Sequence, residues 1–309
     1  MNASMPDAVR VDVLKGDEGV LAQAVFWGLQ PLMLVAALLG WLMHPTSPAL
    51  FAALILAVHV PIAVLEYAMP ARPGWRQTAR EKLLLVAIAV LALAVGGWVG
   101  QLYTQALAEP LTGLREALHL DVWPRHWPLV VQLLMVFFAS ELIWYGLHRA
   151  EHRWALVWRA SGHGAHHAFK RLNAINAGAN HPLEFFLLAL PVLLVDLLFG
   201  VGAPAYGAAL LVLVQTGVVH SNLRLNARVI GWLLTTNAWH LRHHSAELAE
   251  SNTNYGCAAI VWDRVFGTFS PGGMVHAGIG PREPSTLEKL LMPLREPQGS
   301  VIAPTRFGK

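Results

Sequence analysis

Long apolar runs alternate with short polar stretches along the chain. A bilayer core about 30 Å thick needs about 20 mostly apolar residues in a helix, and four runs reach this length. Two further runs are shorter and are separated only by a turn at residues 200–204, which predicts a tight helical hairpin. The six predicted spans are residues 20–43, 49–69, 83–107, 128–147, 183–199 and 203–219.

The composition agrees with a membrane protein. Hydrophobic residues make up 55% of the chain and charged residues 13%, against about 25% charged residues in a typical soluble domain. Although the net charge is +3, the basic residues are scattered, which argues against nucleic-acid binding. The single cysteine, Cys257, excludes an internal disulfide framework and any CxxC pair. We therefore expect an all-α fold, a polytopic membrane helical bundle.

Lysine and arginine predict the orientation of this bundle, because cytoplasmic segments carry their excess. If the N-terminus lies inside, 20 of the 22 basic residues are cytoplasmic and only Arg115 and Arg125 lie outside. The ends of the fourth and sixth spans, and everything after them, are then cytoplasmic. The polar opening of the chain lacks the pattern of a cleavable signal peptide. We expect an integral protein of the inner or plasma membrane whose N-terminus is cytoplasmic.

Ten of the 15 histidines lie between residues 148 and 244, at the predicted cytoplasmic face or its membrane boundary. Side chains three and four residues apart share one face of a helix, so the clustered histidines can offer two imidazoles to one point. The groups are "HRAEH" with His148 and His152, "HGAHH" with His163, His166 and His167, "NHP" with His181, "HSN" with His220, and "HLRHH" with His240, His243 and His244. They predict a cytosolic, histidine-rich helical cap.

The number of imidazoles indicates how many metals they hold. One tetrahedral zinc takes about four ligands, and a catalytic zinc about three protein ligands. Eight to ten imidazoles exceed one such site and fit two metals with four or five nitrogens each. Imidazole suits zinc, copper, nickel and iron. Oxygen chemistry on an unactivated C–H bond would use two irons close together.

The order HxxxH, HxxHH, HxxHH resembles the eight-histidine pattern of the fatty acid hydroxylase and sterol desaturase superfamily. The stretch "NTNYGCAAIVWDRVFGTF" at residues 252–269 is similar to the ending of that family's catalytic region. The likeness covers about residues 140–269. It implies three parts: an N-terminal tail with three spans (1–127), a fatty acid hydroxylase-type catalytic region (128–270) and a C-terminal tail (271–309).

The resemblance implies a membrane-bound, non-haem diiron enzyme that hydroxylates or desaturates a lipid with dioxygen. Its expected substrates are sterols, fatty acyl chains, ether lipids or carotenoids. The sequence has no haem-binding, flavin-binding or ferredoxin-like module, so we expect electrons from a separate electron-transfer protein. The implied ligands are the eight histidines of the three motifs, with His181 and His220 as additional ligating or supporting histidines. Some relatives have a further histidine at the position of Thr216.

Residues around the histidines have expected supporting roles. Asn254 and Asp263 could accept the free N–H of ligand imidazoles, which fixes the tautomer of a ligand. Four glutamates lie near the histidine groups in the sequence: Glu141, Glu151, Glu184 and Glu247. Whether one of them binds a metal or donates a proton stays an open question. Trp239 either packs the cap or meets the substrate.

Two other classes of function compete with an oxygenase. A zinc hydrolase at the membrane interface would need about three ligands and a base, and no dioxygen. A metal transporter or sensor would need ionisable residues along a path through the membrane, but the histidines gather at one face. The sequence does not decide between hydroxylation and desaturation.

Overall fold

The regular structure of the chain is helical. A computed structural model describes residues 19–274 and 276–300. Within them every regular element is a helix, apart from one isolated bridge between Ser245 and Ala277. Six helical segments are long and apolar enough to cross a membrane, which confirms the predicted all-α bundle. They are α1 (Val20–Met43), α2 (Pro48–Ala68), α3 (Ala79–Ala117), α4 (Leu129–Arg153), the segment Pro182–Phe199 and α9 (Ala203–His220).

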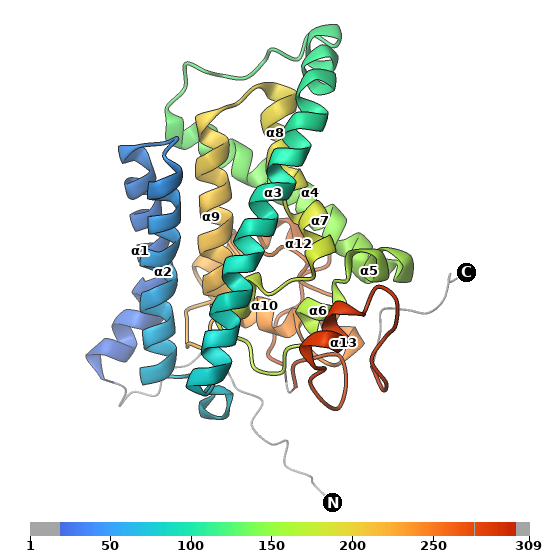
Figure 1. Ribbon diagram of the computed structural model, residues 1–309. Coiled ribbons are helices and arrows are strands. Elements are labelled where there is room, and N and C mark those ends of the chain that lie inside the picture. Colours follow the sequence, from blue (N-terminus) through green and yellow to red (C-terminus); the bar gives the residue numbers. More distant parts are fainter. Residues whose placement is uncertain (1–18, 275, 301–309) are drawn as a thin grey trace, which may run out of the picture.

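The third span, α3, is much longer than the predicted range 83–107. Its 39 residues give a length of about 58 Å at about 1.5 Å per residue, against a bilayer core of about 30 Å. The helix begins before the apolar run because Thr78 and Glu81 form a capping box, in which each side chain accepts a hydrogen bond from the other residue's backbone N–H. Figure 1 shows α3 running the full height of the bundle. Hydropathy finds only the apolar part of this helix.

The fifth span is broken into pieces, whereas the apolar run predicted one helix at 183–199. It consists of η3 (Pro182–Glu184), α7 (Phe185–Leu188) and α8 (Leu190–Phe199). The last break falls just before Pro191, which has no backbone N–H for a helical hydrogen bond. As predicted, α8 and α9 form a hairpin and pack against each other.

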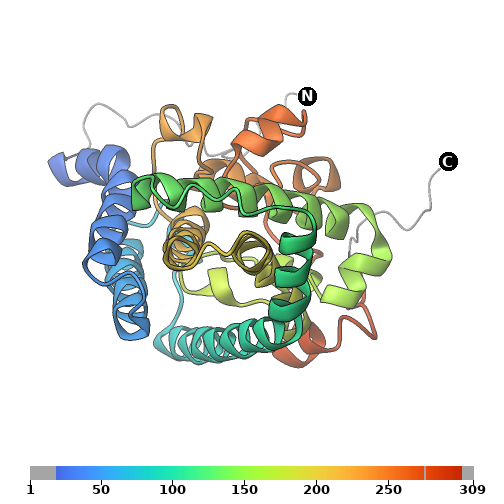
Figure 2. The same ribbon diagram turned by 90° about the horizontal axis from the view of Figure 1, so that it is seen from above.

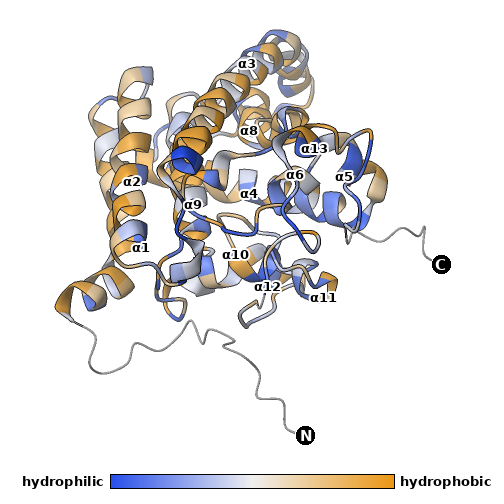
Figure 3. Ribbon diagram, turned by 60° about the horizontal axis from the view of Figure 1, so that its bottom comes forward, coloured by the Kyte–Doolittle hydropathy of each residue, from blue (hydrophilic) through white to orange (hydrophobic). Residues whose placement is uncertain are grey.

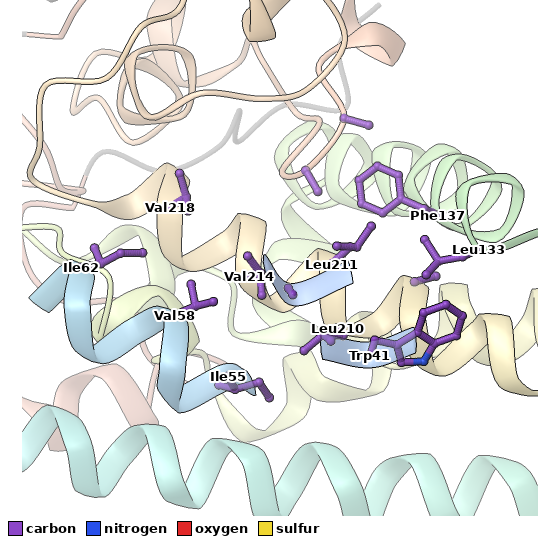
Figure 4. Close-up of a cluster of buried hydrophobic side chains, with 14 of the residues drawn as sticks. Trp41, Ile55, Val58, Ile62, Leu133, Phe137, Leu210, Leu211, Val214 and Val218 are labelled. Atoms are coloured by element: carbon purple, nitrogen blue, oxygen red, sulfur yellow. The ribbon is translucent and has the colours of Figure 1, made fainter. Parts of the chain in front are cut away.

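The centre of the bundle is α9. Seen from above, it lies between α4 and the α1–α2 pair, while α8 lies between α9 and α3 (Figure 2). Its buried residues, including Leu210 and Val214, pack against side chains of α1, α2 and α4 (Figure 4). Gly207 allows the helices to approach closely, because a Cβ there would lie 2.3 Å from a methyl carbon of Leu133 and 2.7 Å from the ring of Trp41.

Short helices and loops form a cap at the end of the bundle where α2, α4 and α9 finish (Figure 1). Hydrophobic residues dominate the long helices, and polar residues gather in the cap (Figure 3). The short elements are η1 (Pro73–Trp75), α5 (Ala155–Ser161), α6 (Gly164–His167), η2 (Asn176–Gly178), η4 (Ile230–Trp232), α10 (Asn237–His243), α11 (Leu248–Ser251), α12 (Val261–Val265) and α13 (Thr286–Leu290).

Two buried carboxylates on the long helices hold the loops of the cap. Oε1 of Glu66 in α2 accepts hydrogen bonds from the backbone N–H groups of Ala174 at 3.0 Å and Asn222 at 2.7 Å. Oε2 of Glu141 in α4 accepts those of residues 258–259 at 2.8 and 3.1 Å. Buried backbone donors are costly when unpaired, so these contacts fix the cap on the bundle.

Candidate metal centre

Four helices bring nine histidines together where the cap meets the bundle. The end of α4 supplies two, α6 with its preceding residue supplies three, α9 ends on one, and α10 with its following residue supplies three. All nine side chains are buried. They are His148, His152, His163, His166, His167, His220, His240, His243 and His244.

Five of these imidazoles form a first group, in which one ring nitrogen from each lies within 4.8 Å of the others. Nε2 of His163 lies 3.1 Å from Nε2 of His148 and 3.1 Å from Nε2 of His152. Nε2 of His152 lies 3.2 Å from that of His167, and Nε2 of His148 lies 3.0 Å from that of His243. The five Nε2 atoms therefore converge.

The other four imidazoles form a second group with the same arrangement. Nε2 of His220 lies 3.2 Å from Nε2 of His166 and 3.0 Å from Nε2 of His240. Nε2 of His244 lies 3.1 Å from Nε2 of His240. The two groups adjoin, because the rings of His167 and His244 stack with centroids 4.4 Å apart.

The tautomers of these rings indicate that a cation belongs between them. Nδ1 of His148 lies 2.6 Å from the carbonyl oxygen of Tyr255, and Nδ1 of His243 lies 2.8 Å from that of Thr253. A carbonyl oxygen only accepts, so both Nδ1 atoms carry the proton. Burial holds the pKa of His243 well below its usual value, so its ring is neutral and its Nε2 carries a lone pair. Two such lone pairs 3.0 Å apart repel each other unless a metal ion binds both.

The spacing of the nitrogens also fits a metal. With metal–nitrogen bonds of about 2.1 Å, ligands at right angles lie about 3.0 Å apart, and tetrahedral ligands about 3.4 Å. The closest Nε2 pairs are 3.0 to 3.2 Å apart in both groups, and all ligand nitrogens of a group lie within 4.8 Å of one another. These values fit right-angled coordination by four or more ligands better than a tetrahedral site.

The second group has fewer supporting hydrogen bonds than the first. Nδ1 of His220 lies 2.8 Å from the carbonyl oxygen of Thr216. In contrast, the Nδ1 atoms of His166, His240 and His244 are buried with no hydrogen-bond partner within the described residues. Partners of this kind orient ligand rings and raise their basicity, so the two groups are not equivalent.

His163 is supported by carboxylates. Its Nδ1 lies 2.8 Å from Oε1 of Glu184 and 3.6 Å from Oε2 of Glu151, and both carboxylates are buried. Both oxygens of Glu151 and Oε2 of Glu184 lack a hydrogen-bond partner among the described residues. A carboxylate in contact with a ring nitrogen is the usual support of a metal-binding imidazole, so the contact with Glu184 suits His163 to bind a metal.

The structure does not bring His181 into either group. Its Nε2 lies 3.1 Å from the carbonyl oxygen of Leu290, and its Nδ1 accepts the backbone N–H of Leu183 at 3.2 Å, which caps η3. Both ring nitrogens therefore have hydrogen-bond partners, and the structure places His181, expected as a ligating or supporting histidine, outside both groups. Its ring instead packs against Gly162, where the backbone turns from α5 towards α6 with φ +73°.

The side chains of Asn254 and Asp263 form hydrogen bonds with backbone groups and not with the imidazole rings. The Asn254 amide donates to the carbonyl oxygens of Trp239 and Ser270. The Asp263 carboxylate accepts the backbone N–H of Tyr255 at 2.8 Å. Neither side chain forms a hydrogen bond with an imidazole among the described residues. Backbone carbonyls face Nδ1 of His148, His220 and His243, while Oδ1 of Asn252 lies 3.3 Å from Nδ1 of His152. Asn254 and Asp263 hold the loop that presents the carbonyls facing His148 and His243.

Trp239 packs the cap. It is buried, and its ring meets that of Phe269 edge-on at 5.4 Å between centroids. It belongs to a small apolar cluster with Ala227, Ala238 and Ile260. The question left open by the sequence is therefore answered in favour of packing.

Sequence reasoning did not identify Glu184 and Glu151 as supports of one particular ligand. A signal was available, because a carboxylate at the edge of an apolar run is costly unless it has a partner. The supporting carbonyls of Thr253 and Tyr255 gave no signal, because every residue has a carbonyl.

Comparison with known proteins gives a consistent set of relatives. The sequence model of the fatty acid hydroxylase family matches residues 133–268. Ornithine lipid hydroxylase OlsE of Rhizobium tropici is 31% identical over 222 residues, which cover 67% of this chain and 63% of the relative. Lathosterol oxidase of Mus musculus is 28% identical over 149 residues, 48% of each chain. Alkylglycerol monooxygenase of Xenopus tropicalis is 24% identical over 170 residues, 52% of this chain and 36% of the relative.

The matches cover less than two thirds of each relative's own length. No solved structure matches the chain. All nine converging histidines fall inside the region that the family model matches. Through residues 133–268, the chain belongs to the fatty acid hydroxylase family.

Proposed function

We propose that this protein is a membrane-bound diiron oxygenase that hydroxylates or desaturates a lipid. The observation that carries this proposal is the convergence of nine buried Nε2 atoms in adjoining groups of five and four. Two irons, when bound, would supply the activation of dioxygen and the electron-transfer steps that an unreactive C–H bond requires. The imidazoles of each group would hold one iron.

The protein's own groups would orient these ligands and exclude water. The backbone carbonyls and Glu184 fix which ring nitrogen faces each metal. Burial of all nine rings keeps water away from the site. In hydroxylation, one oxygen atom of dioxygen enters the C–H bond, and two electrons and two protons convert the other to water. In desaturation, two hydrogens leave the chain, and together with two further electrons and two protons they convert both oxygens to water.

The alternatives explain less of the arrangement. A zinc hydrolase needs about three protein ligands and one open position, which leaves six of the nine imidazoles without a role. A transporter needs a polar path across the membrane, and the nine histidines gather where the cap meets one end of the bundle.

The distribution of basic residues supports a cytoplasmic cap. Among the lysines and arginines that the structure describes, only Arg115 and Arg125 lie at the end of the bundle away from the histidines, near the α3–α4 connection. Because cytoplasmic segments carry the excess of lysine and arginine, the cap would face the cytoplasm of an inner or plasma membrane. There it would meet a separate electron-transfer protein.

The substrate would be a lipid that enters from the bilayer. The named relatives act on an ornithine lipid, a sterol and an alkylglycerol, which have in common a long apolar part. Their names include hydroxylase, oxidase and monooxygenase, so the relatives alone do not decide between hydroxylation and desaturation for this chain.

Lipid mass spectrometry under labelled dioxygen tests the proposal. Cells that express the native protein should contain a lipid class with one added labelled oxygen, or one that has lost two hydrogens. Cells that express His163→Ala or His240→Ala should lack it. Absence of any lipid change, or a change that persists in both variants, would contradict the proposal.

A further inference from the structure

A cavity of about 300 Å³ is lined by residues of α3, α6 and the start of the fifth span, and by none of the nine converging histidines. Its volume is within the size range of ligand pockets. One wall is a stripe of apolar residues along α3, from Leu84 to Val95. Leu84 and Val95 are separated by eleven helical steps, which correspond to about 16 Å. The cavity therefore has one long hydrocarbon wall that follows a membrane-spanning helix.

Two leucines of α3 would connect the cavity with the bilayer. Leu84 and Leu91 line it and are 52% and 59% exposed. In a span, such exposed leucines face lipid chains. A chain could thus pass sideways between the bilayer and the cavity without crossing water.

The other end of the cavity is charged and lies at the membrane boundary. Arg171 pairs with Glu81 at 2.6 Å, and Lys289 pairs with Glu283 at 2.8 Å. All four residues line the cavity. Two positive and two negative side chains give this rim no net charge, so it complements a head group that carries both signs.

We propose that this cavity binds a membrane lipid with a zwitterionic head group. One hydrocarbon chain lies along the apolar stripe of α3, and the head group contacts the two ion pairs at the rim. An anionic head group would meet the two rim carboxylates without a compensating excess of positive charge. An uncharged head group would leave the ion pairs without new partners.

The cavity shares two of its walls with the metal centre. Ala165, between ligand residues of α6, lines it. Pro182 and Phe185 also line it, and between them lies Glu184, the partner of His163. A bound lipid would therefore stabilise the segments that carry and support the ligands. The proposal requires no assumption about the reaction that the protein catalyses.

Thermal unfolding of the full chain in an uncharged detergent tests this site. Added phosphatidylcholine should raise the midpoint of unfolding of the native protein in a saturable way. Phosphatidylglycerol and diacylglycerol should need at least tenfold higher concentrations for the same shift. Equal shifts with all three lipids would overturn the proposal.

Two matched variants locate the effect. In Ala92→Trp an indole fills the cavity, so we expect the phosphatidylcholine shift to disappear. Val90→Trp adds the same ring to α3 at a side chain that is 62% exposed and lies outside the cavity, and should keep the shift. If both variants kept the phosphatidylcholine shift, or if both lost it, the proposed location would be wrong.

The charged rim provides a second test that does not depend on filling the cavity. In the double variant Lys289→Gln/Arg171→Gln, the preference for phosphatidylcholine over diacylglycerol in thermal unfolding should be reduced. Native mass spectrometry should find less bound phosphatidylcholine. Unchanged preference and unchanged bound lipid would overturn the proposal. Because neither residue is a metal ligand, iron content should stay at the native level, which separates this test from that of the proposed function.

Discussion

At the scale of single residues, His163 differs from the other proposed ligands. Its Nδ1 contacts the carboxylate of Glu184 at 2.8 Å, whereas those of His148, His220 and His243 contact neutral carbonyl oxygens. A carboxylate partner makes an imidazole a stronger donor to a metal. Glu184 therefore supports the first group alone.

Glu184→Gln tests this contribution, because the amide oxygen can still accept the hydrogen bond while the charge is lost. We expect metal affinity at the first group to fall by about 10- to 100-fold, measured by iron titration of the apoprotein. Glu247→Gln is the matched control, since Glu247 is exposed and close in sequence to His244. Native affinity in Glu184→Gln would show that the carboxylate has no such role.

The missing partners in the second group predict unequal release of the two metals. Three of its four Nδ1 atoms have no partner within the described residues, and it has one imidazole fewer than the first group. We expect a chelator to remove iron in two phases, the faster from the second group. His240→Ala should lack the fast phase. A single phase in the native protein, or loss of the slow phase in this variant, would contradict the assignment.

At the scale of elements, the structure explains why the chain contains the pattern HxxHH twice. In α6, His163 and His167 join the first group and His166 joins the second. In α10, His243 joins the first group, while His240 and His244 join the second. Each motif therefore supplies both proposed metals, so the two sites are built from the same short helices.

The sequence predicted the long elements well and the interruptions poorly. Apolar runs identified all six spans because membrane thickness sets their length. The break before Pro191 and the polar extension of α3 depend on local hydrogen bonding that hydropathy does not report. Histidine spacing likewise found eight of the nine converging residues. The resemblance added His220, which joins the second group, and His181, which has different contacts. Only the fold places its ring against Gly162.

Gly162→Ala tests how the turn before α6 positions the ligands. Gly162 has φ +73°, and a Cβ there would lie 2.4 Å from the ring of His181. The left-handed conformation alone costs alanine about 1 to 2 kcal/mol, and the clash adds to this cost. We expect a lower midpoint of thermal unfolding and weaker iron binding.

Gly178→Ala is the control for this substitution, because a Cβ at Gly178 meets no atom within 4 Å. It should behave like the native protein in both measurements. If Gly162→Ala also behaved like the native protein, the turn would not position α6.

At the scale of the whole molecule, the cap and the two ends of the bundle define the topology. The cap lies where α2, α4 and α9 end, and the α3–α4 and α8–α9 connections lie at the opposite end (Figure 1). With the cap in the cytoplasm, the loop that contains Asp121 faces outward. The orientation can therefore be tested with one residue from each end.

Cysteine labelling of intact cells tests this orientation. The single native thiol interferes little, because burial raises the pKa of Cys257 to about 12 and keeps it protonated. A membrane-impermeant thiol reagent should label Asp121→Cys in intact cells, since this side chain is 80% exposed. It should label Glu247→Cys only after permeabilisation. The reverse pattern would place the cap outside.

The metal content of the purified protein is the most direct test for two iron sites. Protein from cells supplied with iron should contain about two irons per chain, in keeping with two groups of converging imidazoles. His163→Ala and His240→Ala, which each remove a ligand of one group, should each contain about one iron. Two zinc ions per chain, no bound metal, or native iron content in both variants would contradict the account.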